Sequence, residues 1–266
     1  MGFNKPYSNA TRTKVALSAL LALLVVGTQT VSAATTALAN DDWVGISFWI
    51  ATAMMLAFTV FFLIERQNVP DKWKTSMTVA ALVTGVAWYH YTYMRDHWVA
   101  TGQSPLVLRY VDWLITVPLQ IVEFYLILAA IGLASAMLFW RLMGASIVML
   151  GFGFLGESGS LDMMIAFIPA VLAWIYIIYE IWSGEAGKAV SGASEGVQFA
   201  YTMMKYILTF GWAIYPAGYL YGMGDSPDID MLNIVYNLAD VVNKTAFGLM
   251  VWYAATMDSA ASESKE

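Results

Sequence analysis

Residues 106–129 read LVLRYVDWLITVPLQIVEFYLILA, and this stretch decides the fold. It is long enough for a helix that crosses a bilayer, which needs about 20 mainly apolar residues. It nevertheless carries Arg109, Asp112 and Glu123. An ionisable residue inside a membrane span costs roughly 3 kcal/mol or more, so such residues usually face a bundle interior and serve a function. We therefore expect a transmembrane helix with a polar inner face.

Six other stretches have similar length and composition. The whole chain of 266 residues is 59% hydrophobic and 12% charged, whereas a soluble domain has about 25% charged residues. The expected spans are 43–65, 73–94, 106–129, 134–155, 162–182, 197–221 and 231–257. Their connections are short, so neighbouring spans should pack antiparallel. The predicted fold class is all-α, a seven-transmembrane-helix bundle.

The N-terminal segment has the pattern of a processing signal. A basic region precedes the apolar stretch 15–26, and small residues follow at 31–33. We expect residues 1–33 to be a signal peptide and residues 34–266 to form the membrane domain. An uncleaved anchor helix is the alternative.

The distribution of basic residues predicts the orientation. Three bases, Arg66, Lys72 and Lys74, lie near the connection between the first two spans. Lys188 lies in the connection between the fifth and sixth spans, and Lys265 lies in the C-terminal tail. The opposite connections are mainly acidic. We therefore expect the N-terminus outside the cell and the C-terminus inside.

Several functional classes lack support in the sequence. There is no cysteine for a disulfide, a thiolate metal site or a nucleophile. The two histidines lie on one segment, so no metal site is expected. The net charge of −6 and the scattered bases give no basis for nucleic-acid binding. No nucleotide loop or nucleophile triad suggests an enzyme.

The charges of the third span share one helical face. Arg109 and Asp112 are three residues apart, and Thr116 follows one turn later. Glu123 is eleven residues beyond Asp112, about three turns, so it faces the same way about 16 Å further along the helix. Acidic groups are therefore expected at two depths.

The seventh span carries Asp240 and, four residues later, Lys244. The predicted arrangement is a buried lysine with Asp112 and Asp240 on its outer side and Glu123 far on its inner side. Ion pairs that join helices would explain a single pair but not charges at several depths. A buried lysine is a suitable site for a Schiff base with a carbonyl ligand, and the two aspartates would supply its counter-ions.

Aromatic residues lie at matching depths of the third, sixth and seventh spans. They are Trp113, Trp212, Tyr215 and Tyr236. Such rings can line a slot for a long, flat, apolar chromophore. Ordinary membrane packing or an interfacial aromatic belt is the alternative.

Four motifs together resemble the microbial rhodopsins, specifically the proteorhodopsins. They are RYVDWLITVPLQIVE (109–123), WAIYP (212–216), NLADVVNK (237–244) and WYHYTYMR (88–95). The resemblance extends over about 43–257. It implies all-trans retinal as cofactor, bound as a protonated Schiff base on Lys244.

The resemblance also implies proton-transfer roles. Asp112 would be the primary proton acceptor and Asp240 the second counter-ion, with Glu123 as the cytoplasmic proton donor. His90 would hydrogen-bond Asp112, or it would be an ordinary polar residue between helices.

Other residues receive supporting roles. Thr116 would support the acceptor region, and protons would leave outward past Arg109. The sixth span would tilt about Pro216, whose ring removes a backbone hydrogen bond. Gln120 would tune the colour, because this position tends to be Gln in blue-absorbing and Leu in green-absorbing members.

The set of Asp, Thr and Glu at 112, 116 and 123 resembles that of proton pumps. The implied function is a light-driven outward proton pump that absorbs blue light. A slow-cycling photosensor on the same fold is the main alternative, followed by a receptor for a diffusible ligand and a light-gated channel. The expected partners are protons, the lipid bilayer of a bacterial inner membrane and further copies of the chain in a ring-like homo-oligomer.

Overall fold

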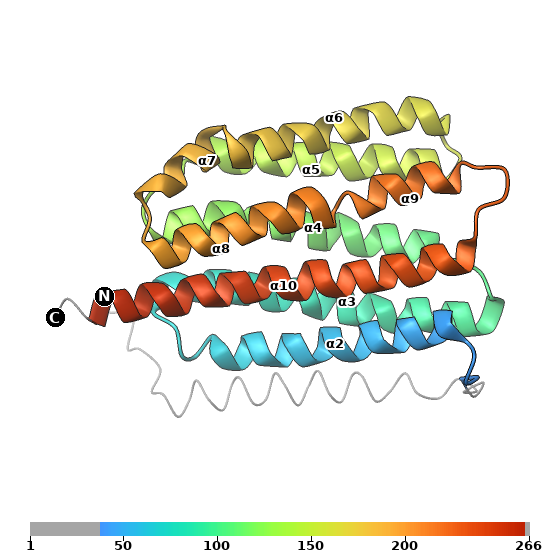
Figure 1. Cartoon of the computed structure of the whole chain (residues 1–266), viewed down its shortest axis with the longest axis horizontal. Helices are drawn as coiled ribbons and strands as arrows, with labels where there is room; N and C mark the ends of the chain where they lie inside the picture. The colour runs from blue at the N-terminus through green and yellow to red at the C-terminus, as the bar shows by residue number, and fades with distance from the viewer. Residues whose placement is uncertain (1–37, 264–266) are drawn as a thin grey trace, which may run out of the picture. The chain divides into compact units, whose positions relative to one another are not determined.

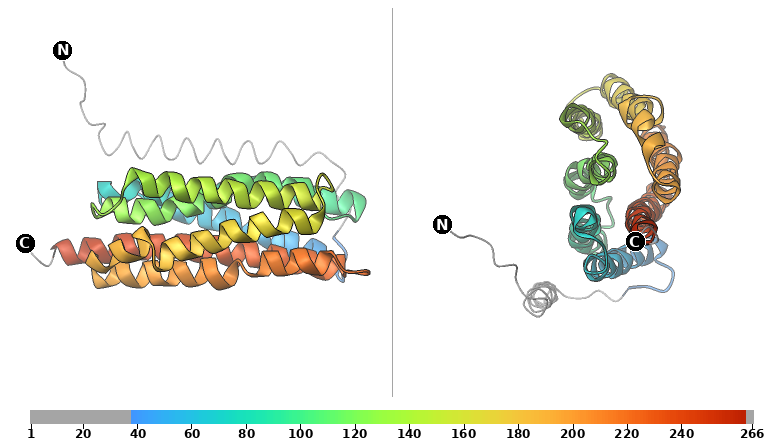
Figure 2. Two further views of the ribbon diagram at one scale, coloured as in Figure 1. Left: turned by 90° about the horizontal axis from the view of Figure 1, so that it is seen from above. Right: turned by 90° about the vertical axis from the view of Figure 1, so that its left-hand side faces the viewer.

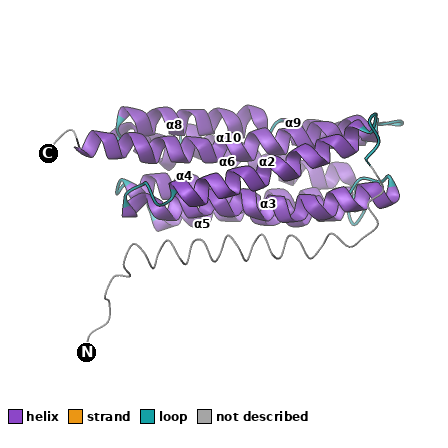
Figure 3. Cartoon of the chain, turned by 90° about the horizontal axis from the view of Figure 1, so that it is seen from below, coloured by secondary structure: helices purple, strands orange, loops and turns teal. Residues whose placement is uncertain are grey.

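The structure, a computed structural model, describes the backbone of residues 38–263 and the side chains of residues 38–258. The expected signal peptide lies outside the described residues. Within the described part every regular element is helical, with no strand (Figure 3). The helices are α2 (Trp43–Glu65), α3 (Lys74–Thr101), α4 (Leu106–Ala130), α5 (Ala136–Glu157), α6 (Met163–Trp182), α7 (Glu185–Ala189), α8 (Glu195–Tyr206), α9 (Ile214–Gly222) and α10 (Ile229–Glu263).

These helices make the seven expected spans. The sixth span is built from α8, a π-helical turn (Ile207–Gly211) and α9, which follow one another along the bundle (Figure 1). The connection before it holds the short α7 and a 3₁₀ turn (Val190–Gly192), and another 3₁₀ turn (Asp71–Trp73) precedes α3. None of these irregular elements was predicted from the sequence.

The spans form a closed ring when the bundle is seen end on (Figure 2, right). Sequential neighbours pack from α2 through α6, α6 packs on α8, α8 on α10, and α10 on α2. Residues of α4 and α10 meet inside this ring. The third and seventh spans, which carry the predicted charges, therefore face each other.

The α4 helix has its polar residues inside and its apolar residues outside. Asp112 and Glu123 are buried, whereas Val111 and Ile115 are more than 40% exposed. Placing an unpaired charge in an apolar medium costs free energy, whereas lipid solvates apolar side chains favourably. This distribution fits a bundle surrounded by lipid. The α2, α4 and α5 helices and the segment Met163–Gly192 are also long and apolar enough to span a membrane, with mean hydropathy of 1.7 to 2.1.

The second span is longer than predicted. It continues past 94 to Thr101, beyond the apolar part of the sequence. The helix ends where Gly102 adopts φ 63° and its N–H donates to the Trp98 carbonyl at 2.7 Å. Glycine adopts this left-handed conformation without steric cost, so it is a common helix terminator. The hydrophobic pattern alone therefore placed the boundary too early.

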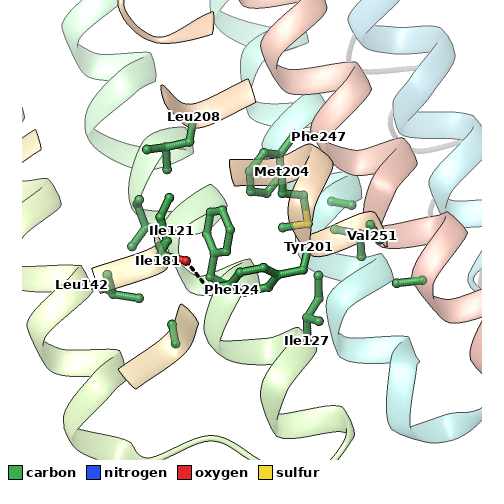
Figure 4. Packing of buried hydrophobic residues seen from close by; sticks show 14 of the residues in the cluster. Ile121, Phe124, Ile127, Leu142, Ile181, Tyr201, Met204, Leu208, Phe247 and Val251 are labelled. Atoms are coloured by element: carbon green, nitrogen blue, oxygen red, sulfur yellow. Dashed lines mark hydrogen bonds between the residues drawn. The ribbon is translucent and has the colours of Figure 1, made fainter. Parts of the chain in front are cut away.

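An apolar layer fills the bundle between α4, α8 and α10 (Figure 4). The Phe124 ring lies 5.2 Å from the Tyr201 ring and 5.5 Å from the Phe247 ring, both edge-on. Such pairs contribute about 0.5–1.5 kcal/mol beyond their buried area. Figure 4 also shows the Tyr201 hydroxyl donating to the Ile181 carbonyl, at 3.1 Å. The layer leaves few polar groups next to Glu123.

Candidate retinal site

The Lys244 amine lies between two carboxylates. Its Nζ donates to Asp112 Oδ2 at 3.0 Å and to Asp240 Oδ2 at 2.7 Å. All three side chains are at most 2% exposed. Because α4 supplies one acid and α10 the other, the site exists only when these helices pack together. The structure thus brings together the predicted lysine and its two predicted counter-ions.

The two carboxylates have different surroundings. Asp240 accepts hydrogen bonds from the hydroxyls of Tyr215 at 2.6 Å and Tyr91 at 2.9 Å, and from the Trp113 indole at 3.3 Å. Asp112 accepts only a long bond, 3.5 Å, from the Thr116 hydroxyl besides the lysine. Its Oδ1 has no hydrogen-bond partner among the described residues. Asp240 is therefore saturated with donors, whereas Asp112 keeps spare acceptor capacity.

His90 lies beside this spare oxygen. Its Nδ1 is 3.6 Å from Asp112 Oδ1 and 3.0 Å from the Val86 carbonyl. The His90 ring nitrogen therefore lies close to Asp112, as expected, but it is nearer to the backbone carbonyl of Val86.

Arg109 is held by amides rather than by acids. Its guanidinium donates to the side-chain oxygens of Asn233 at 2.9 Å and Asn237 at 2.7 Å. In the described part of the chain no carboxylate lies in ion-pair range of it. Arg109 and the two aspartates therefore interact only at distances longer than an ion pair. The side chain is 1% exposed.

Glu123 lies apart from the lysine. It is 1% exposed. Within residues 38–258 neither carboxylate oxygen makes a hydrogen bond of good geometry, although the Ala80 backbone lies within reach of the carboxyl group. An ionised carboxylate without a partner would be costly in this environment. Burial and isolation both suit a carboxylic acid that is protonated at rest and can later donate its proton.

A cavity that is partly open extends from the lysine. The predicted residues that line it are Trp113, Gln120, Trp212, Tyr215, Pro216, Tyr236, Asp240 and Lys244. Most other lining residues are apolar or aromatic, among them Val117, Met149 and Phe167. An apolar cavity that ends on a buried amine fits a long hydrocarbon aldehyde such as retinal.

A family profile described as bacteriorhodopsin-like protein matches residues 42–257.

The chain belongs to the bacteriorhodopsin-like family.

Two curated relatives narrow the position within the bacteriorhodopsin-like family. The green-light absorbing proteorhodopsin of Gamma-proteobacterium EBAC31A08 is 54% identical, and the match covers 83% of this chain and 89% of the relative. The blue-light absorbing proteorhodopsin of Gamma-proteobacterium Hot 75m4 is 53% identical with the same coverage.

Solved structures agree. The crystal structure of blue light-absorbing proteorhodopsin from Med12 has a TM-score of 0.71 and 56% identity, covering 81% of this chain and 99% of that one. Xanthorhodopsin, described as a light-driven ion pump with dual chromophore, has a TM-score of 0.76 and 27% identity, covering 85% and 98%. This bacteriorhodopsin-like protein is a membrane protein, and retinal is the cofactor of its family.

Four polar residues of this bacteriorhodopsin-like site were not predicted from the sequence. Asn233 and Asn237 share a helical face with Asp240 and Lys244, and this spacing could have revealed them. Tyr91 directly follows His90, but its contact with Asp240 depends on how α3 packs on α10. Asn243 bonds to the sixth span. No local pattern in the sequence marks that contact.

Proposed function

We propose that the protein is a light-driven outward proton pump that carries all-trans retinal on Lys244. The observation that supports this most is the buried amine between Asp112 and Asp240, with Glu123 isolated in an apolar layer further along α4. Bound retinal supplies the absorption of light and a change of shape at the lysine nitrogen. The remaining work belongs to the protein's own side chains.

Asp112 is the proposed proton acceptor. Its Oδ2 is 3.0 Å from Lys244 Nζ, within reach of direct transfer. The donors around Asp240 favour its charged form, so Asp240 remains as the fixed counter-charge. Thr116 supports Asp112, and His90 lies beside its second oxygen. The proton then leaves outward past Arg109.

Glu123 is the proposed donor to Lys244 on the opposite side. It lies about 16 Å from Asp112 along α4, from the helical rise of ~1.5 Å per residue. Its neighbour Phe124 belongs to the apolar layer described above, together with Ile121 and Ile127 of the same helix. Because acceptor and donor are at different depths, each cycle moves a proton in one direction.

The proposed topology makes this direction outward. Residues 1–33 are a cleaved signal peptide, 34–266 form the membrane domain, and the C-terminus lies in the cytoplasm of the bacterium. The support is the position of the basic connections. On the family resemblance, we also propose that copies assemble into a ring-like homo-oligomer.

Illumination of cells that contain the protein and retinal tests the proposal. The medium should become acidic, and a protonophore should abolish the change. Slow recovery of the dark spectrum with no acidification would favour the photosensor instead, and passive flow down an imposed gradient would favour a channel.

Glu123→Gln should slow the return of the dark spectrum by roughly 10²-fold, since a positioned acid or base contributes about 10²–10⁴-fold to proton transfer. Formation of the early intermediates should keep its rate, because Lys244 and Asp112 are unchanged. Flash photolysis measures both phases. As a control, Glu195→Gln alters an exposed acid of α8 and should leave both rates unchanged. Equal slowing in both variants would contradict the donor role.

Gln120→Leu should move the absorption maximum to longer wavelength. Gln120 lines the cavity and donates to the Asn243 carbonyl at 3.2 Å, so its amide dipole is fixed beside the chromophore. Its loss changes how the ground and excited charge distributions are stabilised. A visible spectrum of the reconstituted protein checks this, and Gln198→Leu in α8 is the control. An unchanged spectrum would contradict the blue-tuning proposal.

A further inference from the structure

The π-helical turn of the sixth span leaves one carbonyl without its usual helical partner. In a regular helix the Gly211 carbonyl would accept from the Tyr215 N–H. Here the Tyr215 N–H donates to the Trp212 carbonyl at 3.1 Å, and Pro216 has no N–H to donate. The wide turn itself closes with the Trp212 N–H on Ile207, at 3.2 Å.

Asn243 of the seventh span supplies the missing donor. Its Nδ2 donates to the Gly211 carbonyl at 3.0 Å and to the Tyr215 hydroxyl at 3.3 Å. Both hydrogens of the amide are thus given to the sixth span. Asn243 is 3% exposed and directly precedes Lys244.

The contact also requires a glycine. A Cβ at Gly211 would lie 2.1 Å from Asn243 Oδ1 and 3.0 Å from Cγ. The amide therefore packs directly on the glycine backbone. A side chain at Gly211 would separate the two spans or rotate the amide away.

The same amide is linked to the counter-ion. The Tyr215 hydroxyl that receives its weaker hydrogen bond donates in turn to Asp240 at 2.6 Å. One side chain thus touches the irregular turn, the tyrosine that holds Asp240 and, through the backbone, Lys244.

We infer that Asn243 is a positioning residue that clamps the π-helical turn of the sixth span to the seventh span beside Lys244. This inference deepens the proposed function and rests on it for the role of the clamp during pumping. While the clamp is closed, α8 stays packed and the inner side of the site stays shut. Movement of α8 away from the bundle must break the bond to Gly211 first.

Spin labels can test the clamp directly, since the chain has no native cysteine. Thr75→Cys and Glu195→Cys place labels at exposed positions near the starts of α3 and α8. The distance distribution is measured in the dark, with and without retinal. Asn243→Ala should increase the population with longer distances about fivefold, the effect of losing one net hydrogen bond of about 1 kcal/mol.

Gly211→Ala should produce the same increase from the other partner. Its matched control is Gly222→Ala at the end of α9, where an added Cβ meets nothing within 4 Å. Because both changes act on one contact, the double variant should show about the effect of a single one. If Gly211→Ala does not fold, the comparison of Asn243→Ala with Gly222→Ala still tests the clamp.

Unchanged distances in Asn243→Ala and Gly211→Ala would overturn the clamp, as would an equal change in Gly222→Ala. The retinal-free measurement does not depend on pumping. If the parent protein fails to acidify the medium while Asn243→Ala widens the distribution, the clamp stands and the pump proposal fails. If the parent pumps and the distances do not change, only the clamp fails.

Discussion

Lys244→Ala is expected to give a protein that stays colourless when all-trans retinal is added. The only amine on the cavity wall is removed, so no covalent link to the aldehyde can form. Asp112 and Asp240 also lose their shared cation inside the bundle. Breaking a buried ion pair typically costs about 3–5 kcal/mol, so the melting temperature should fall as well. Absorption spectra and thermal unfolding in detergent measure the two effects.

Lys205→Ala is the matched control for this experiment. Lys205 lies in α8 with its amine 4.5 Å from the Trp182 ring, away from the cavity. This variant should bind retinal and gain the colour of the parent protein. Retention of colour in Lys244→Ala would contradict the assignment of the cofactor site, and so would loss of colour in both variants.

Asp112→Asn should reduce light-driven acidification by at least about 100-fold, the lower limit for loss of a positioned acid or base. The amide cannot take the proton from Lys244 Nζ. Asp240 is nearer to the amine, at 2.7 Å, but its carboxylate already accepts hydrogen bonds from two tyrosine hydroxyls. Colour should persist, because Lys244 and Asp240 remain. The measurement is the initial rate of pH change in illuminated cells, normalised to bound pigment.

Asp96→Asn is the control for the acceptor variant. Asp96 pairs with Arg95 at the exposed end of α3 and has no contact with the cavity. It should pump at the parent rate. Pumping by Asp112→Asn at that same rate would show that Asp112 is not the acceptor.

Helical periodicity predicted the third span well. Arg109, Asp112, Thr116 and Glu123 lie on one face by spacing alone, and all four are buried. The same reasoning placed Asp240 one turn before Lys244, where it now forms an ion pair. Such inferences succeed because the geometry within one helix depends only on residue spacing.

Contacts between helices were harder to predict. The partners of Arg109 depend on the rotation of α4 against α10, and the Tyr91 bond to Asp240 depends on α3. The spacing of residues within one span does not determine how that helix is rotated against its neighbours. Asn243 is a further example, because its role follows from a π-helical turn that the sequence did not reveal.

The closure of the ring by α2 and α10 has a consequence for biosynthesis. The starts of these helices, Trp43 and Ile229, are 186 residues apart in the chain, and ribosomes add about 5–20 residues per second. The first helix therefore waits roughly 10–40 s for its last neighbour to be made. Asp112 is synthesised well before Lys244, so the pigment can form only after the last helix has been made. Until then the polar face of α4 must be kept away from lipid by contacts with the insertion machinery or with the helices made before α10.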